Sequence, residues 1–227
     1  MQDLCIFGDS IAKGIVFDEM KQRYTVLKDN FIALAAKRIG LKARNFASFG
    51  ATTKKGSRIL DRRSEELSDC RYTLLEFGGN DCNLDWSAIA EDPDAEAPAS
   101  VPLPEFMKTY EAMIDKVLEA GSCPILLTLP PLDSDYFFAN ISEGLNAGNI
   151  LTFLGGDLEN INRWHEGYNE GIRKIAKERH LPLIDLSEAF PAGESKHYLC
   201  KDGMHPNEAG HRRLAECMTP ALRSLIA

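Results

Sequence analysis

The sequence lacks any long hydrophobic run, any cluster of basic residues and any signal-peptide pattern. No apolar segment approaches the roughly 20 residues that span a bilayer, so we expect no membrane insertion. The chain carries 34 acidic and 26 basic residues, and its net charge of −8 disfavours binding to nucleic acid or to an anionic membrane surface. Strand-like residues follow Met1 almost directly, which leaves no room for a signal peptide and predicts a cytoplasmic protein.

Closely spaced cysteine pairs are also missing. The sequence contains no Cys-x-x-Cys pair, and its six cysteines are dispersed along the chain at Cys5, Cys70, Cys82, Cys123, Cys200 and Cys217. This spacing favours reduced, buried thiols over a zinc site or a disulfide framework. Asp133 and Asp135 lie close together, but no histidine or further spaced carboxylate accompanies them, so we expect solvated acids of a loop and no metal ion.

The distribution of apolar residues predicts an α/β fold. The chain has 227 residues, 44% of them hydrophobic, and we expect one domain over residues 1–227. Short apolar segments alternate with segments of helical periodicity, as in a parallel sheet covered by helices. The expected strands cover residues 4–7, 41–47, 72–77, 124–129 and 181–186, and the expected helices cover residues 31–39, 56–67, 104–119, 157–179 and 207–226.

The first expected strand ends in a turn that presents a hydroxyl group. The apolar run from Leu4 to Phe7 stops at Gly8 and Asp9, and Ser10 follows directly. A continuous apolar run is typical of a central parallel strand that is buried on both faces. Ligands of open α/β sheets bind beyond the carboxyl ends of the strands, so the position of Ser10 favours a functional role.

A serine hydroxyl becomes a good nucleophile only when a base removes its proton, and a third group usually orients that base. Near the end of the chain, Asp202 precedes His205 by three residues in a turn marked by glycine and proline. Asp202 could hold the imidazole of His205 while that imidazole reaches Ser10. Alternatively, Asp202 simply caps a turn and His205 is an exposed loop residue, which is the commoner explanation for a short motif that stands alone.

Two more turns follow expected strands. Gly50 lies in a run of small residues after the second strand, where free backbone amides could face a ligand, although an ordinary turn also requires glycine. Asn80 lies in the turn Gly78-Gly79-Asn80-Asp81 after the third strand. Its side-chain amide could stabilise a developing oxyanion, or it could support the loop in an Asx turn.

Two segments are longer than ordinary connections. Residues 84–104 are acidic and proline-rich, and we expect a surface excursion without a function of its own. Residues 132–156 contain Phe137 and Phe138 among other apolar side chains, and this segment is too apolar to be disordered. These phenylalanines could line a substrate pocket or lid, or they could pack on the core. The remaining histidines, which lie in helical or polar contexts, are expected at the surface: His165, His180, His197 and His211.

The four turn motifs occur in one order along the chain: Gly8-Asp9-Ser10, Gly50, Gly78-Gly79-Asn80-Asp81 and Asp202-Gly203-Met204-His205. Together they resemble the SGNH hydrolase superfamily, the GDSL esterases and lipases, and the resemblance covers residues 7–206. It implies a three-layer α/β/α sandwich with a five-stranded parallel sheet of flavodoxin-like topology.

The resemblance also assigns roles to individual residues. Ser10 would be the nucleophile, His205 the general base and acid, and Asp202 the group that orients His205. The oxyanion hole would consist of the backbone amides of Ser10 and Gly50 and the side chain of Asn80. The two long excursions do not belong to the shared pattern of the family, so the resemblance does not predict the substrate.

These motifs predict a serine ester hydrolase that needs no metal or organic cofactor and acts on small-molecule, sugar or lipid esters. An acyltransferase would use the same residues and pass the acyl group to an alcohol. A non-catalytic flavodoxin-like binding module is a third possibility, because that topology also binds phosphates at strand ends. Asp9 argues against it, because a carboxylate would lie beside the phosphate.

Overall fold

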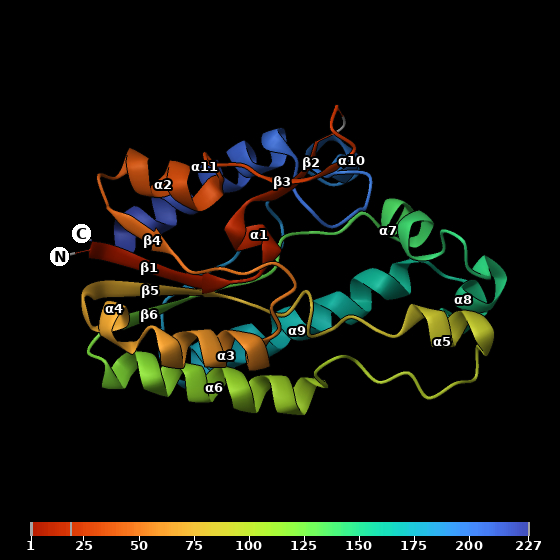
Figure 1. Ribbon diagram of the computed structural model, residues 1–227, viewed down its shortest axis with the longest axis horizontal. Coiled ribbons are helices and arrows are strands. Elements are labelled where there is room, and N and C mark those ends of the chain that lie inside the picture. Colours follow the sequence, from red (N-terminus) through yellow and green to blue (C-terminus); the bar gives the residue numbers. More distant parts are fainter. Residues whose placement is uncertain (1, 19, 227) are drawn as a thin grey trace.

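The computed structural model describes residues 2–18 and 20–226, and its centre is a sheet of five parallel strands (Figure 1). The spatial order of the strands is β4-β1-β5-β6-β7, which is the flavodoxin-like order. All five predicted strands are confirmed, with boundaries that differ by a few residues. The strands are β1 (Gln2–Gly8), β4 (Ala43–Asn45), β5 (Cys70–Glu76), β6 (Cys123–Leu127) and β7 (Leu183–Ile184).

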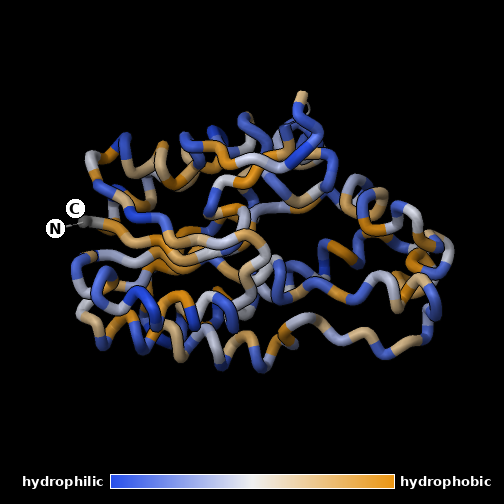
Figure 2. The backbone as a smooth tube through the Cα atoms, viewed as in Figure 1, coloured by the Kyte–Doolittle hydropathy of each residue, from blue (hydrophilic) through white to orange (hydrophobic). Residues whose placement is uncertain are grey.

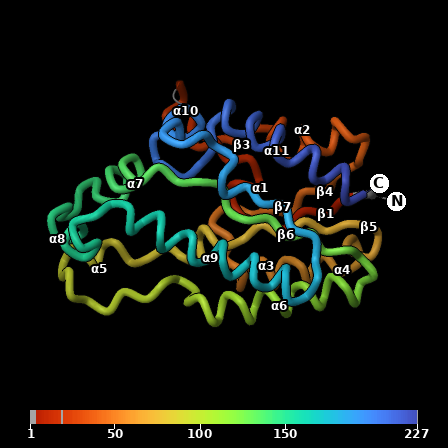
Figure 3. The backbone as a smooth tube through the Cα atoms, turned by 180° about the vertical axis from the view of Figure 1, so that it is seen from behind, coloured from red at the N-terminus to blue at the C-terminus, as the bar shows by residue number. Residues whose placement is uncertain are grey.

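Helices cover both faces of this sheet and produce the predicted three-layer arrangement. Helices α2 (Phe31–Arg38) and α11 (Glu208–Ile226) pack together on one face. Helices α3 (Thr53–Arg62), α6 (Leu103–Glu119) and α9 (Glu159–Glu178) cover the other face, as the views from front and back agree (Figures 1 and 3). Within the described residues, no helix combines the length and the apolarity needed to cross a membrane.

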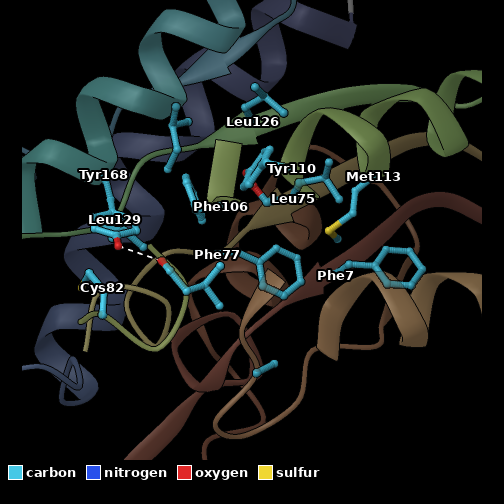
Figure 4. Packing of buried hydrophobic residues seen from close by; sticks show 14 of the residues in the cluster. Phe7, Leu75, Phe77, Cys82, Phe106, Tyr110, Met113, Leu126, Leu129 and Tyr168 are labelled. Carbon is cyan, nitrogen blue, oxygen red and sulfur yellow. Dashed lines mark hydrogen bonds between the residues drawn. The ribbon is translucent and has the colours of Figure 1, made fainter. Parts of the chain in front are cut away.

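Residues of β1 alternate between two separate cores. Leu4 and Ile6 belong to the cluster under α2 and α11, whereas Cys5 and Phe7 belong to the cluster under α3, α6 and α9. The central strands β1, β5 and β6 are accordingly orange, the hydrophobic colour, over much of their length (Figure 2). Figure 4 shows how Phe7 lies near Phe77 and Met113 in the second cluster. The apolar run of β1 is therefore buried on both faces, as the sequence predicts.

Local signals explain where the principal helices begin. The Asn30 side chain caps α2 by accepting hydrogen bonds from Ile32 N at 3.1 Å and Ala33 N at 3.0 Å. Pro104 lies in the first turn of α6, where a backbone N–H would have no partner within the helix, so its absence removes no hydrogen bond. The helix expected over residues 56–67 is instead two helices, α3 and α4 (Ser64–Ser68), which are interrupted at Arg63.

Shorter elements that the sequence did not reveal surround the carboxyl ends of the strands. Strands β2 (Ile15–Asp18) and β3 (Arg23–Val26) form an antiparallel pair of their own. Residues 83–101 and 132–165 form a projection beyond the sheet, which we call the distal lobe (Figures 1 and 3). The remaining short helices are α1 (Ser10–Lys13), α5 (Trp86–Glu91), α7 (Ser134–Ile141), α8 (Ala147–Phe153) and α10 (Ser195–Tyr198).

The structure corrects the expectation that all cysteines are reduced. Cys5 on β1 and Cys70 on β5 form a disulfide, with Cα atoms 5.8 Å apart. The two strands are direct neighbours in the sheet, and pairing brings together residues 65 positions apart in sequence. Sequence spacing alone carries no information about this register. The other four cysteines keep their thiol groups, as expected: Cys82, Cys123, Cys200 and Cys217.

Candidate active site

Ser10 lies at the carboxyl end of β1, as the first residue of the short helix α1. Asp9 precedes this helix and accepts a hydrogen bond from Ile11 N at 2.8 Å, which fixes the turn that presents Ser10. Gly8 is required here because a Cβ atom would overlap the side chain of Ala12 and the carbonyl oxygen of Glu76. The turn therefore holds the Ser10 hydroxyl in one buried position at the edge of the sheet.

The turn after α10 brings His205 and Asp202 to Ser10. Asp202 Oδ1 accepts hydrogen bonds from the backbone amides of Met204 and His205, both at 2.9 Å. His205 Nδ1 lies 2.8 Å from Asp202 Oδ2, and His205 Nε2 lies 2.9 Å from Ser10 Oγ. Because an ionised carboxylate can only accept, Nδ1 carries the proton in the neutral imidazole and Nε2 is free to accept one from Ser10. All three predicted residues meet in one chain of hydrogen bonds.

Asp202 is ionised at neutral pH despite its burial. Burial alone would raise the pKa of its carboxyl, but the hydrogen bond and charge of His205 and the hydroxyl of Tyr24 outweigh that effect and lower the pKa to about 2. Gly203, with a φ of 74°, lies so close to the backbone of α7 that any side chain there would overlap Phe137 N. The distal lobe and the Asp202–His205 turn thus support each other.

Two aromatic residues that the sequence did not indicate flank the histidine. Tyr24 on β3 donates a hydrogen bond from Oη to Asp202 Oδ2 at 2.6 Å, and its ring lies 5.3 Å from the His205 ring. Phe49 lies parallel to His205 at 6.2 Å between ring centroids. Tyr24 stands in no recognisable motif, so the sequence did not connect it with Asp202, 178 residues away.

Asn80 and Gly50 lie at the neighbouring strand ends, in the same cavity as Ser10. Asn80 Nδ2 donates to Asp9 Oδ2 at 3.0 Å and, over a longer distance of 3.3 Å, to Ala51 O. Asp81 connects the two loops, because its carboxylate accepts from both Thr53 N and Thr53 Oγ1. The turns that the sequence singled out are therefore bound to one another.

A buried pair of carboxyl groups lies under Ser10. Glu76 Oε2 accepts from the backbone amides of Asp9 and Ala12, each at 3.3 Å, whereas Glu76 Oε1 has no hydrogen-bond partner among the described residues. Burial and the neighbouring charge of Asp9 raise the pKa of Glu76 well above its ordinary value of 4.5. Burial also raises the pKa of Asp9. A charged residue at the end of an otherwise apolar strand was the available sequence signal for this pair.

A cavity of about 640 Å³ extends from Ser10 and His205 into the distal lobe. The sequence left open whether Phe137 and Phe138 line a pocket or pack on the core. Phe137 lines this cavity and also belongs to the buried core cluster, whereas Phe138 lies outside the cavity and packs against that cluster. Residues 84–104 were expected to have no function, yet three of their side chains line the cavity. The apolar residues of the wall in the lobe are Leu84, Trp86, Ala97, Leu132, Phe137, Phe153, Leu154, Ile161 and Trp164.

Of the four histidines expected at the surface, two are exposed and two are buried. His180 and His197 are exposed as expected, whereas His165 and His211 are buried. His211 stacks on Phe31 in the core under α11, and burial lowers its pKa to about 3. His165 lines the cavity. Its spacing of four residues from Ile161, on the buried face of α9, was a sequence signal for burial.

Comparison with known proteins agrees with this geometry. The model of the GDSL-like Lipase/Acylhydrolase family matches residues 6–213. The chain is 26% identical over 214 residues to the isoamyl acetate-hydrolyzing esterase of Saccharomyces cerevisiae. This alignment covers 91% of the chain and 80% of the yeast protein.

Solved structures share the fold. The lipase/acylhydrolase from Enterococcus faecalis has a TM-score of 0.68 at 19% identity and covers 99% of this chain and 97% of its own. The psychrotrophic esterase EstA from Pseudoalteromonas sp. has a TM-score of 0.65 at 13% identity and covers 100% of this chain and 99% of its own.

Proposed function

Because the chain belongs to the GDSL-like Lipase/Acylhydrolase family and is a carboxylic-ester hydrolase, we propose that Ser10, His205 and Asp202 are its catalytic triad. The observation that carries this proposal is the unbroken series of hydrogen bonds from Ser10 Oγ through both nitrogens of His205 to Asp202 Oδ2. Nucleophile, base and orienting carboxylate are within hydrogen-bond reach of one another, as acyl transfer requires.

The reaction follows from this arrangement. Ser10 Oγ attacks the ester carbonyl while His205 Nε2 takes its proton, and a tetrahedral intermediate forms. The intermediate expels the alcohol, which leaves with the proton from Nε2, and an acyl-enzyme remains on Ser10. His205 then deprotonates a water molecule that attacks the acyl carbon, and returns the proton to Ser10 as the acid departs. Asp202 keeps the proton on Nδ1 and stabilises the imidazolium in both steps.

The developing oxyanion needs hydrogen-bond donors, and we assign this role to the backbone N–H groups of Ser10 and Gly50 and to Asn80 Nδ2. Asn80 Nδ2 keeps its shorter bond to Asp9, which holds the amide plane. Its longer bond to Ala51 O is the weaker of the two and can be exchanged for the oxyanion. Asp9 therefore acts as a positioning residue for Asn80.

The cavity supports an uncharged, largely apolar ester as substrate. Aromatic and aliphatic side chains dominate its wall in the distal lobe, and one cation of the lining, Arg163, is already paired with Asp157 at 2.9 Å. The yeast relative is named for the hydrolysis of isoamyl acetate, a small apolar ester. We therefore propose that the arm of the ester that enters the lobe is an alkyl chain of moderate length.

Substitution of the nucleophile tests the proposal. We expect Ser10→Ala to lower kcat for p-nitrophenyl esters by about a thousandfold or more without changing the thermal melt. A fluorophosphonate probe should label the wild-type protein at Ser10 alone, as peptide mass spectrometry can show. Ser68→Ala, on the exposed surface of α4, is the matched control and should keep full activity. Retained activity in Ser10→Ala, or labelling of a different serine, would refute the triad.

A further inference from the structure

His165 is a buried polar side chain with no role in the triad. It lies on α9, only 7% of its surface is exposed, and its ring lines the cavity that begins at Ser10. The ring forms no hydrogen bond with any residue of the described ranges 2–18 and 20–226. Ile161, one turn earlier on the same helix face, is apolar and fills the equivalent place in the wall. Packing alone therefore does not require an imidazole at this position.

The ring faces the cavity, and its nitrogens are not among the fully buried atoms without a partner, so a group that enters the cavity can bind it. Burial lowers the pKa of His165 to about 4, against the opposing charge of Glu166, so the ring is neutral at physiological pH. A neutral imidazole offers one N–H donor and one nitrogen acceptor. A hydroxyl group, which can both accept and donate, complements either tautomer.

Neighbouring polar side chains on α9 are already engaged. Trp164 Nε1 donates to Cys82 O at 2.8 Å, Asn160 Nδ2 donates to Leu154 O at 2.8 Å, and Arg163 is paired with Asp157. His165 is thus the polar side chain with unused hydrogen-bonding capacity among these residues of α9. Because the His165 ring is neutral and Arg163 is already paired with Asp157, neither side chain offers a counter-ion to a charged group of the substrate.

We infer that His165 is a specificity-determining residue that hydrogen-bonds a hydroxyl group on the ester arm inside the distal lobe. The preferred substrates are then esters with a hydroxylated arm, either monoesters of diols or esters of hydroxy acids. The inference rests on the proposed function, because it places the scissile ester at Ser10. The His165 hydrogen bond adds a polar contact to a pocket that would otherwise select substrates only by the length of their alkyl chain.

Matched ester pairs test this contact. One series compares alkyl acetates with ω-hydroxyalkyl acetates, and a second compares ethyl alkanoates with ethyl ω-hydroxyalkanoates, each over several chain lengths in a pH-stat assay. The measured quantity is the ratio of kcat/KM for the hydroxylated ester to kcat/KM for the plain ester. We expect this ratio in the wild type to peak at one chain length in one series, where the hydroxyl reaches His165. His165→Leu should lower the peak about three- to tenfold, as expected for the loss of one uncharged hydrogen bond.

Two further variants make the result specific. His165→Gln keeps a donor and an acceptor and should retain part of the preference. His197→Leu changes an exposed histidine and should leave the ratio at its wild-type value. An identical ratio in the wild type and His165→Leu at every chain length of both series would overturn the inference, and so would a His197→Leu effect of equal size.

Calorimetric binding of the same pairs to Ser10→Ala separates this inference from the proposed function, because it needs no turnover. If Ser10→Ala still hydrolyses the esters, the triad is wrong. The His165 contact is then judged by whether the hydroxylated partner binds more tightly and whether His165→Leu in the Ser10→Ala background removes that difference. An equal affinity for both partners would refute the contact even if the triad is correct.

Discussion

Tyr24 and His205 both form a hydrogen bond to the same carboxylate oxygen of Asp202. Both Tyr24 Oη and His205 Nδ1 bind Asp202 Oδ2, at 2.6 Å and 2.8 Å. The hydroxyl withdraws part of the negative charge from this oxygen, so it helps to lower the pKa of Asp202. The same withdrawal weakens the stabilisation that Asp202 gives to the imidazolium form of His205. Tyr24 thus limits the negative charge that Asp202 presents to the His205 ring.

The Tyr24 hydroxyl helps to hold the pKa of Asp202 at about 2, so this carboxylate stabilises the fold above its ordinary pKa of 3.8 and loses that contribution as the pH falls towards 2. We therefore expect Tyr24→Phe to raise the pKa of Asp202 and to flatten the profile of unfolding free energy against pH in this acidic range, as urea denaturation can measure. The phenylalanine keeps the ring beside His205 and removes only the hydroxyl. Tyr198→Phe, which removes a hydroxyl from a ring stacked on Phe190, is the control and should keep the wild-type profile. A Tyr24→Phe protein with a lower unfolding free energy but an unchanged acidic slope would show that Tyr24 only supports packing.

The sequence predicted the residues that perform the chemistry better than those that adjust it. Ser10, Asp202 and His205 stand in short motifs at strand ends, where residue type and position both point to their roles. Tyr24 and His165 have no such motif. Tyr24 reaches the site through a strand pairing that sequence does not encode locally, and His165 differs from a core histidine only by the cavity beside it.

At the scale of elements, the distal lobe determines what the cavity can accept. Helix α7 places Phe137 in the cavity wall, with its ring 6.1 Å from Trp86, and places the next residue, Phe138, outside the cavity against the core. The two phenylalanines thus form a natural pair for comparison: the same side chain, on the same helix, with and without access to substrate.

Truncation of each phenylalanine separates pocket shape from packing. Phe137→Ala should shift the kcat/KM ratio between longer and shorter acyl esters by roughly tenfold, because burying one methylene contributes about 0.8 kcal/mol and the enlarged cavity accepts one or two more. Both truncations should lower the melting temperature, because Phe137 belongs to the buried cluster and Phe138 packs against it, but Phe138→Ala should leave the chain-length profile unchanged. If both variants keep the wild-type profile, the distal lobe does not contact the substrate arm.

The elements that the sequence missed are those without a regular apolar period. Strands β1, β5 and β6 are buried on both faces and appear as continuous apolar runs, so they could be predicted. Strand β3 has only four residues and is mostly exposed, so its polar–apolar alternation spans too few positions to establish a regular period. Short helices such as α5 and α8 are stabilised by contacts with each other, including a bond from Asn149 Nδ2 to Ala90 O at 2.8 Å.

At the scale of the whole molecule, the central sheet connects the site with both cores. Glu76 ends β5 between the two clusters and holds the Ser10 turn through the backbone amides of Asp9 and Ala12. Its pKa is raised in the folded protein, so the folded state binds a proton that the unfolded state releases above about pH 4.5. The resulting stability is fully present below pH 4.5 and is lost as the pH rises through the folded pKa.

We therefore expect Glu76→Gln to flatten the dependence of the unfolding free energy on pH above 4.5. Glutamine is nearly isosteric, keeps an oxygen for the two amides and cannot ionise, so it removes a slope of up to about 1.4 kcal/mol per pH unit. Asp81, whose pKa burial raises to about 6, contributes its own slope in both proteins. Urea denaturation at intervals from pH 4.5 to 8 measures the difference, with Glu105→Gln on the exposed start of α6 as the control. Equal slopes in the wild type and Glu76→Gln would mean that Glu76 is ionised in the folded protein, and the buried carboxyl pair would then have to hold two negative charges.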